Sequence, residues 1–410
     1  MTELYVVGVG MTRFGKHFDR SVKDLTQEAV SAALADAGID KADISSAYFA
    51  NASQAAIEGQ YMIPGQLALR AAGFESIPIV NVENACASAS TAFHLACLQL
   101  KAGDADVVLA VGAEKMYALD KQKSFAVFHG AWDVNDVDGT MRHLSHLGGT
   151  ATSQITEETA SRSVFMDIYA ALAKQHMRLF GTTERQLAAV AAKNHRHSVL
   201  NPLSQYQTSM TIDEVLAARK VTWPLTLPMC APISDGAAAA IVCRKDVLHR
   251  FDRTRAVGVY ATELASGSSR DVSDYRAHIC HRAAMRAYDR AGLGPKDMSL
   301  AEVHDATAVG EIIQVENIGL CEFGEGGPLA ERGATSLGGE IPVNPSGGLE
   351  SKGHPIGATG LGQIFELVTQ LRYEAGPRQV SGARFAIAEN GGGFHGYEEA
   401  AACITILGKG

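Results

Sequence analysis

"DAGIDKADISSAYFAN", residues 36–51, is repeated without a gap as "RAGLGPKDMSLAEVHD" at residues 290–305. The alignment pairs Gly38 with Gly292. In the first copy, apolar residues at helical spacing precede the glycine and a strand-like run follows it. A repeated unit of this length is too long for a solenoid. It predicts an α/β fold whose two halves pack as two sheets around a pseudo-twofold axis.

A second, looser match supports the same organisation. "DVVLAVGAEKM" from residue 106 resembles "RFAIAENGGG" from residue 384. Between the copies, residues 120–250 are richer in charge, histidine and methionine, which predicts an insertion on the scaffold, where binding surfaces usually lie. We therefore expect a first half over 1–119, an inserted region with a return strand over 120–250, and a second half over 251–410.

The composition excludes several classes of protein. The chain has 410 residues, 46% of them hydrophobic and 20% charged, with a net charge of −9, which argues against binding to nucleic acid or to an anionic membrane. No apolar run is long enough to span a bilayer, and the N-terminus lacks signal-peptide features, so we expect a cytoplasmic protein. Seven scattered cysteines without a C-x-x-C pair predict reduced thiols and no metal centre.

Cys86 lies in "NVENACASAST", residues 81–91, between an apolar strand and a helix of small residues. Unpaired N–H groups at a helix start favour a thiolate and can also hold an oxyanion. On position alone, a packed structural thiol remains the commoner outcome, because free cysteines are among the most buried residues.

Three other stretches offer partners for this thiol. "GGLESKGHPIGATGLGQ", 347–363, holds His354 between a glycine and a proline, where it could act as a base. "EVHDAT", 302–307, places His304 at the end of the repeated strand. "AENGGGFHG", 388–396, ends another strand in a glycine loop that could supply N–H donors.

Together these elements resemble the thiolase superfamily, most closely its sterol-carrier-protein-type branch, over essentially the whole chain. The matching pieces are "NVENACASAS" around Cys86, "HDAT" at 304–307, "NPSGGLESKGHPIGATG" at 344–360, and "SDGAAAAIV" from 234. The resemblance implies a thiolase fold with duplicated α/β halves packed as a five-layered αβαβα core. It also implies acyltransferase activity in acyl-CoA metabolism.

The resemblance further implies roles for individual residues. Cys86 would carry the acyl group as a thioester, and His354 would activate the thiol. His354 would also help to form an oxyanion hole, which His304 would complete directly or through water. The N–H groups of Cys86 and of Gly391 or Gly392 would stabilise the tetrahedral intermediate of acyl transfer. Coenzyme A would be a substrate held by the inserted region, with no permanently bound cofactor.

Two kinds of partner follow from the same resemblance. A homodimer is expected, with the strand "IPIVNVE" near its interface. Some members of this branch act only beside a small, zinc-containing OB-fold protein, so this chain could be one subunit of such a complex.

The chain departs from the family at its second cysteine. Many relatives have an acid/base cysteine in the last glycine loop, where this chain has Glu389 and Asn390, and others have H-D-C-F, where this chain has Ala306 and Thr307. Glu389 is the only ionisable residue in "AENGGG", and burial would raise its pKa toward the working range of a proton shuttle. A hydrogen-bonded structural carboxylate is an equally good interpretation.

Two enzymatic interpretations remain open. The first is a thiolase that cleaves a 3-oxoacyl-CoA or runs the reverse Claisen condensation by ping-pong chemistry. The second is a condensing enzyme with a Cys-His-His set. Other motifs carry less weight: "GVGMTRFG" departs from the dinucleotide-binding spacing, and "HICH" at 278–281 lacks companion metal ligands.

Overall fold

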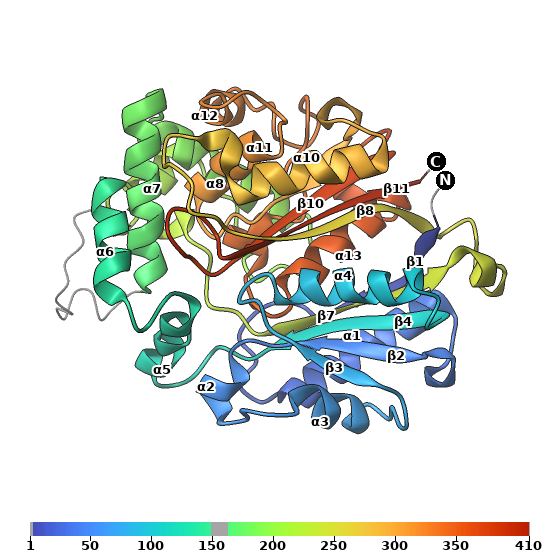
Figure 1. The fold of residues 1–410 in the computed structure, drawn as a ribbon. Helices are drawn as coiled ribbons and strands as arrows, with labels where there is room; N and C mark the ends of the chain where they lie inside the picture. Colours follow the sequence, from blue (N-terminus) through green and yellow to red (C-terminus); the bar gives the residue numbers. More distant parts are fainter. Residues whose placement is uncertain (1–2, 149–162, 410) are drawn as a thin grey trace.

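The computed structural model describes residues 3–148 and 163–409, which form a nine-stranded sheet with helices on both faces (Figure 1). The first half contributes strands in the order β3-β2-β4-β7-β1, and the second half continues with β8-β11-β10-β9. The strands are β1 (Leu4–Met11), β2 (Ser46–Ala50), β3 (Ile79–Val82), β4 (Val107–Glu114), β7 (Gly236–Arg244), β8 (Val257–Ser266), β9 (Leu300–Glu302), β10 (Phe385–Gly392) and β11 (Ala401–Gly408).

The sequence repeat is a structural repeat. Helix α1 (Val22–Ala37) ends at Gly38 with φ +67°, and α10 (Ile279–Ala291) ends at Gly292 with φ +65°. Both glycines adopt the left-handed conformation that commonly closes a helix. In each copy a short 3₁₀ turn then leads into the second strand of that half, which is β2 or β9.

The halves stack in the five layers that the resemblance implied. Helices α4 (Ser88–Lys101) and α13 (Thr359–Leu371) lie in the middle and contact strands of both halves (Figure 1). Helix α1, with α3 (Pro64–Ala71), covers the outer face of the first half, and α10, beside α11 (Ala308–Asn317), covers the second. This arrangement buries both faces of the sheet, so its central strands are almost continuously apolar.

One feature differs from the expected pair of separate sheets. Strands β1 and β8 pair antiparallel at Tyr5 with Gly258 and at Val6 with Val257, which joins the two half-sheets edge to edge. The pairing covers two residues of each strand at an edge that would otherwise be open. The middle layer is tight because Gly360 on α13 meets the backbone of Ser90 on α4, where a Cβ would collide.

Between β4 and β7 the chain forms a helical region beside the sheet. It contains α5 (Lys121–Ala126), α6 (Val137–His146), α7 (Val164–Phe180), α8 (Glu184–Val199), α9 (Ile212–Ala217) and the hairpin β5 (Lys220–Thr222) with β6 (Leu225–Thr226). Two shorter helices lie in the halves themselves, α2 (Gln54–Glu58) and α12 (Gly326–Glu331). Part of the expected insertion, residues 149–162, lies outside the described residues, and the three domain boundaries stay a prediction. Each helix of the described ranges is too short or too polar to cross a bilayer.

Candidate active site

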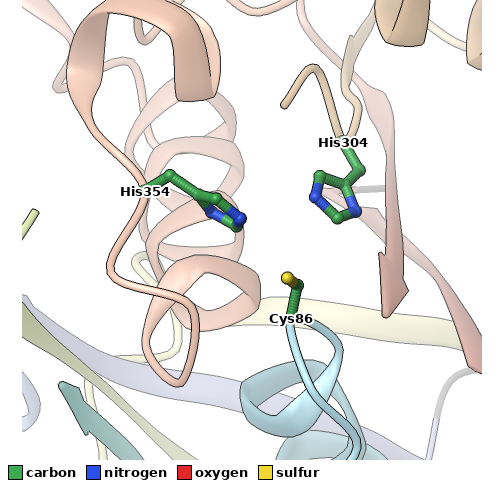
Figure 2. A group of neighbouring side chains, drawn as sticks. All are labelled: Cys86, His304 and His354. Carbon is green, nitrogen blue, oxygen red and sulfur yellow. The ribbon is translucent and has the colours of Figure 1, made fainter. Parts of the chain in front are cut away.

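Cys86, His304 and His354 meet at the centre of the molecule, although they come from three different segments. The Cys86 sulfur and a ring nitrogen of each histidine all lie within 4.8 Å of one another. Figure 2 shows both rings directed toward the sulfur. The residues are only 8%, 4% and 6% exposed, so their chemistry takes place away from bulk water.

Cys86 is presented by a tight turn between β3 and α4. Ala85 adopts a left-handed conformation with φ +48°, and the N–H of Ala87 donates to the carbonyl of Asn84 at 2.9 Å. The Ser88 hydroxyl stabilises the same turn by donating to the Ala85 carbonyl at 2.6 Å. A side chain at Gly392 would collide with Asn84, so that glycine lets the turn approach β10.

The electrostatics of Cys86 differ from those expected for a thiol at a helix start. Burial, reinforced by the charge of Glu114, raises the pKa of Cys86 to about 12. The backbone N–H groups of Gly393 and of Cys86 itself oppose this shift. Desolvation therefore outweighs the helix dipole, and the thiol is protonated at neutral pH. A base must remove its proton before the sulfur can attack.

His354 is built to be that base. Its backbone N–H donates to the Ser234 hydroxyl at 2.9 Å, and its Nδ1 lies 2.7 Å from the Thr359 hydroxyl. Thr359 gives its own proton to the Pro355 carbonyl at 3.0 Å, so its oxygen accepts from Nδ1–H of His354. This network assigns the proton to Nδ1 and leaves Nε2 as an acceptor. Burial holds the pKa of His354 well below its usual range, so the ring is neutral.

His304 follows β9 and faces His354, with 5.2 Å between the ring centroids. Burial lowers the pKa of His304 to about 4, and the backbone of Gly391 opposes that shift. Apart from this contact with the Gly391 backbone, neither ring nitrogen has a hydrogen-bond partner among the described residues. A neutral ring carries one N–H, so His304 can donate one hydrogen bond to a substrate oxygen.

Glu389 lies behind His304. Its Oε2 accepts from the backbone N–H of His304 at 2.9 Å, and its Oε1 accepts from the Cys280 thiol at 3.4 Å. Burial raises the pKa of Glu389 to about 8, with a further contribution from the charge of Glu399. The contacts are those of a residue that positions His304, and the role of Glu389 as a proton shuttle stays a prediction.

The three glycines at the end of β10 differ in their contacts. Gly391 and Gly392 pair with Ala402 and Ala401 in the β10–β11 ladder. Gly393, with φ +66°, is the one whose backbone N–H bonds the Cys86 sulfur. The oxyanion role predicted for Gly391 or Gly392 remains untested, and the structure adds Gly393 as a donor facing the nucleophile.

Two buried carboxylates that sequence reasoning did not single out hold the His354 loop. Asp305 accepts from the N–H groups of Leu349 at 2.7 Å and Glu350 at 3.3 Å. Glu114 accepts from the N–H of Gly357 at 3.0 Å. The sequence gives one indication of these roles, which is that each acid lies at or just beyond the end of a repeated strand. The partners lie tens to hundreds of residues away along the chain.

A second group of potential ligands lies near the first. His278, Cys280 and Glu399 also place their ligand atoms within 4.8 Å of one another. In the second group the Cys280 thiol donates to Oε2 of Glu399 at 3.7 Å, so these atoms bond one another rather than a metal ion. The "HICH" motif at 278–281 therefore does have a companion, Glu399, which is far away in the sequence.

This duplicated α/β architecture, with a buried thiol between two histidines, defines the class of protein. Residues 4–216 match the family model for the thiolase N-terminal domain, and residues 261–409 match that for the thiolase C-terminal domain-like family. The chain belongs to the thiolase family and is an acyltransferase enzyme of that type.

Individual relatives support the assignment. The chain is 39% identical over 402 residues to acetyl-CoA acetyltransferase of Methanothermobacter thermautotrophicus, covering 97% of this chain and 98% of that protein. It is 37% identical to sterol carrier protein 2 of Bos taurus, covering 94% of this chain and 69% of that protein. The solved structure of an Ltp2-ChsH2(DUF35) aldolase shares the fold, with a TM-score of 0.78, 22% identity, and coverage of 99% of this chain and 98% of that one.

Proposed function

We propose that this enzyme is a CoA-dependent thiolase that cleaves a 3-oxoacyl-CoA with free CoA, or runs the reverse Claisen condensation. The observation that carries the proposal is the group formed by the Cys86 sulfur and two neutral imidazoles, all within 4.8 Å. A protonated thiol beside an unprotonated imidazole nitrogen is a nucleophile with its base in place.

The first half-reaction follows from this geometry. Nε2 of His354 takes the thiol proton of Cys86 while the sulfur attacks the 3-oxo carbonyl carbon. The resulting oxyanion is stabilised by the backbone N–H groups of Cys86 and Gly393. The bond between the carbonyl carbon and the α-carbon then breaks. This leaves an acyl group on Cys86 and the enolate of an acetyl-CoA-like product. An acid in the site protonates the enolate carbon, and His354 passes the proton of Cys86 to that acid, so the imidazole is neutral again for the second half-reaction.

In the second half-reaction the acyl group passes to free CoA. His354 deprotonates the CoA thiol, whose sulfur attacks the Cys86 thioester and releases the cysteine. We assign to the N–H of His304 the hydrogen bond to the thioester oxygen of the enolate in the carbon–carbon step, because neither ring nitrogen bonds a side chain among the described residues. We place CoA against the inserted region, residues 120–250, as the resemblance implies.

Product analysis tests this proposal. The purified chain is incubated with a 3-oxoacyl-CoA and free CoA, and separately with malonyl-CoA and an acyl-CoA. We expect the first mixture to give two acyl-CoA products. Condensation with release of carbon dioxide from malonyl-CoA, without thiolysis, would replace the thiolase assignment by the Cys-His-His condensing enzyme.

A second candidate is a thiolase subunit that requires a small OB-fold partner. The Ltp2-ChsH2(DUF35) aldolase, which shares the fold of this chain, is named for two components. Exposed apolar side chains on this chain offer surface for such a contact, including Tyr61, Met62 and Leu119. If the chain alone is inactive in thiolysis and co-expression with such a partner restores turnover, the subunit assignment holds.

A homodimer belongs to the same proposal. Strand β3 ends the sheet, pairs only with β2 among the described strands, and exposes 45% of Val80. An open apolar edge strand of this kind is a template for pairing with a second copy. Light scattering should give twice the chain mass, and Val80→Lys should shift it toward the monomer. A wild-type monomer at micromolar concentration would contradict the dimer.

We also place the enzyme in the cytoplasm. All seven cysteines are free thiols, which suits a reducing compartment.

A further inference from the structure

A second thiol lies directly behind the catalytic histidines. Cys280, in the first turn of α10, places its sulfur 3.4 Å from Oε1 of Glu389 and 3.7 Å from Oε2 of Glu399. His278 adds its Nε2 at 3.4 Å from the same oxygen of Glu399. Two carboxyl groups, a thiol and an imidazole therefore form one hydrogen-bonded cluster that the acylation chemistry above leaves unused.

Of the two carboxyl groups, only Glu399 faces open space. Glu399 is 16% exposed and lines a cavity of about 60 Å³ whose wall also includes Tyr169 and Phe394. Glu389 is 0% exposed and is absent from that wall. A substrate in the cavity can touch the carboxyl group of Glu399, whereas Glu389 can act only through its neighbours.

Gly393 links the cavity to the nucleophile, because it forms part of the cavity wall and its backbone N–H bonds the Cys86 sulfur. Cys86, His304 and His354 themselves are not part of that wall. The carboxyl carbon of Glu399 and Nδ1 of His304 each lie 3.3 Å from the point that a Cβ of Gly391 would occupy. Any side chain at Gly391 would therefore separate these two groups, and glycine lets both approach the same space.

The hydrogen bonds of Glu399 come from neutral donors. Nδ1 of His278 accepts from the Cys280 backbone N–H and from the Asn317 amide, both at 3.2 Å. The ring proton is therefore on Nε2, which lies 3.4 Å from Oε2 of Glu399. Burial keeps the pKa of His278 well below its usual range, so the ring is uncharged. The Gln314 amide donates to the other Glu399 oxygen at 2.7 Å.

The other carboxylates of the cavity wall are engaged differently. Glu398 pairs with Arg270 at 2.7 Å, and Glu316 bonds Nε2 of His176 at 3.1 Å. Within the described residues, Glu399 makes no ion pair with a lysine or arginine side chain inside 4 Å. A carboxylate held by neutral donors keeps its basicity, and burial raises the pKa of Glu399 further.

We propose that Glu399 is the acid/base residue that exchanges the α-proton of the substrate, in the place of the second cysteine that this chain lacks. The inference rests on the proposed thiolase function, because it supplies the carbon-acid step of that reaction. Glu389 and Cys280 act as positioning residues that fix Glu399 and His304 relative to each other.

The step balances without any further reactant. In condensation, the Glu399 carboxylate takes a proton from the α-carbon of a CoA thioester, and the C–H electron pair forms the enolate, whose oxygen bonds His304. The enolate carbon attacks the acyl group on Cys86 and forms a carbon–carbon bond as the carbon–sulfur bond breaks. Cys86 leaves as the thiolate, and the proton that Glu399 gained returns to the sulfur through Nε2 of His354. Thiolysis runs these events in reverse, with protonated Glu399 supplying the proton.

Deuterium exchange tests the inference separately from the acylation chemistry. The full-length enzyme is incubated with acetyl-CoA in D₂O. Mass spectrometry follows both the acetyl adduct on Cys86 and deuterium in the methyl group of acetyl-CoA. We expect Glu399→Gln to be acetylated at Cys86 at nearly the wild-type rate while exchange falls by about 10²-fold or more, the usual scale for a general base. Glu263→Gln serves as the control, because Glu263 is a buried carboxylate, 4% exposed, that pairs with Arg290 outside the site.

Three outcomes decide the question. Exchange within about threefold of wild type in Glu399→Gln would overturn the proposal. If the variant loses acetylation as well, Glu399→Ala is assayed with added formate: exchange restored by formate supports the role, and exchange that stays lost overturns it. A wild-type enzyme that never acetylates Cys86 would instead refute the proposed function, and that result is visible in the adduct measurement alone.

Discussion

The two strand-to-helix turns that face each other across the middle layer occupy equivalent places in the repeat, yet they are built differently. In the first copy, β3 pairs parallel with β2 and the following turn carries Cys86 into α4. In the second copy, Val343 bridges parallel to Ala301 of β9, and the longer loop that follows carries His354 into α13. The repeat therefore places two strand-to-helix turns close together. The turn of the first copy carries the nucleophile, and the loop of the second copy carries the base.

What differs is the means of support. The Cys86 turn is short and is held by its own backbone, with a left-handed Ala85 and local bonds to Asn84 and Ser88. The His354 loop is held by distant side chains, among them Asp305 and Glu114. A nucleophile can be placed by a local turn alone, whereas a neutral base with a defined tautomer needs a polar network around it.

Substituting His354 should have the largest effect of the variants that compare the roles of the two turns. His354→Ala leaves the Cys86 thiol with a pKa raised by burial and with no adjacent acceptor for its proton. Turnover should fall by about 10²- to 10⁴-fold, and alkylation of Cys86 by iodoacetamide near neutral pH should slow. His94→Ala is the matched control, because His94 is buried on α4 but bonds Thr262. Unchanged alkylation in His354→Ala would refute the assignment of the base.

Distorting the second turn should have a smaller effect. A Cβ at Gly348 would collide with the Asp305 carboxylate, and its φ of +61° disfavours any side chain. Gly348→Ala should cost about 1–3 kcal/mol of unfolding free energy and reduce turnover through misplacement of His354. Gly376→Ala is the control, because Gly376 has a φ of +59° but open space around it. This variant therefore measures the backbone strain without the collision. Equal losses in the two variants would show that the Asp305 contact is unimportant.

The tautomer of His354 can be tested more finely. Thr359→Val keeps the shape of the side chain and removes the acceptor of Nδ1–H, so we expect a loss of about tenfold in kcat with a smaller change in KM. Thr369→Val is the control, since that hydroxyl makes the same type of bond to a carbonyl four residues earlier on α13. Thr359→Ser should recover most of the activity, and failure to do so would argue against the hydroxyl.

The last prediction concerns how stability, rather than turnover, depends on pH. Burial raises the pKa of Glu389 to about 8 from its ordinary value of 4.5. The stability that its proton contributes is therefore fully present below about pH 4.5 and is lost as the pH rises through about 8. Glu389→Gln does not titrate, so its unfolding free energy relative to wild type should increase from about pH 5 to pH 8 and then level off. A pH-independent difference in urea titrations would show that Glu389 does not titrate in this window.

The features that could be predicted from the sequence are those set by a few neighbouring residues. The repeat around Gly38 and Gly292 predicted the duplicated α/β architecture, and short motifs identified Cys86, His304 and His354, which the structure brings together. Such features are readable because each depends on a few neighbouring residues.

The remaining features depend on contacts between distant segments. Cys280 reaches Glu389 and Glu399 because α10 packs on β11, more than a hundred residues further along the chain. The pKa of Cys86 was expected to be lowered by the helix start, yet burial raises it, and burial is a property of the assembled core. The pairing of β1 with β8 likewise has no local signal.

The central claim is that the turn of the first copy carries the acyl group. Its most direct test is to incubate the enzyme with an acyl-CoA, quench the mixture, and map the adduct by mass spectrometry of its peptides. We expect a thioester on Cys86 alone, and none on Cys97, which is 0% exposed on α4, the helix that follows the Cys86 turn, and is not grouped with the two histidines. An adduct on any other cysteine, with Cys86→Ala still active, would contradict the account.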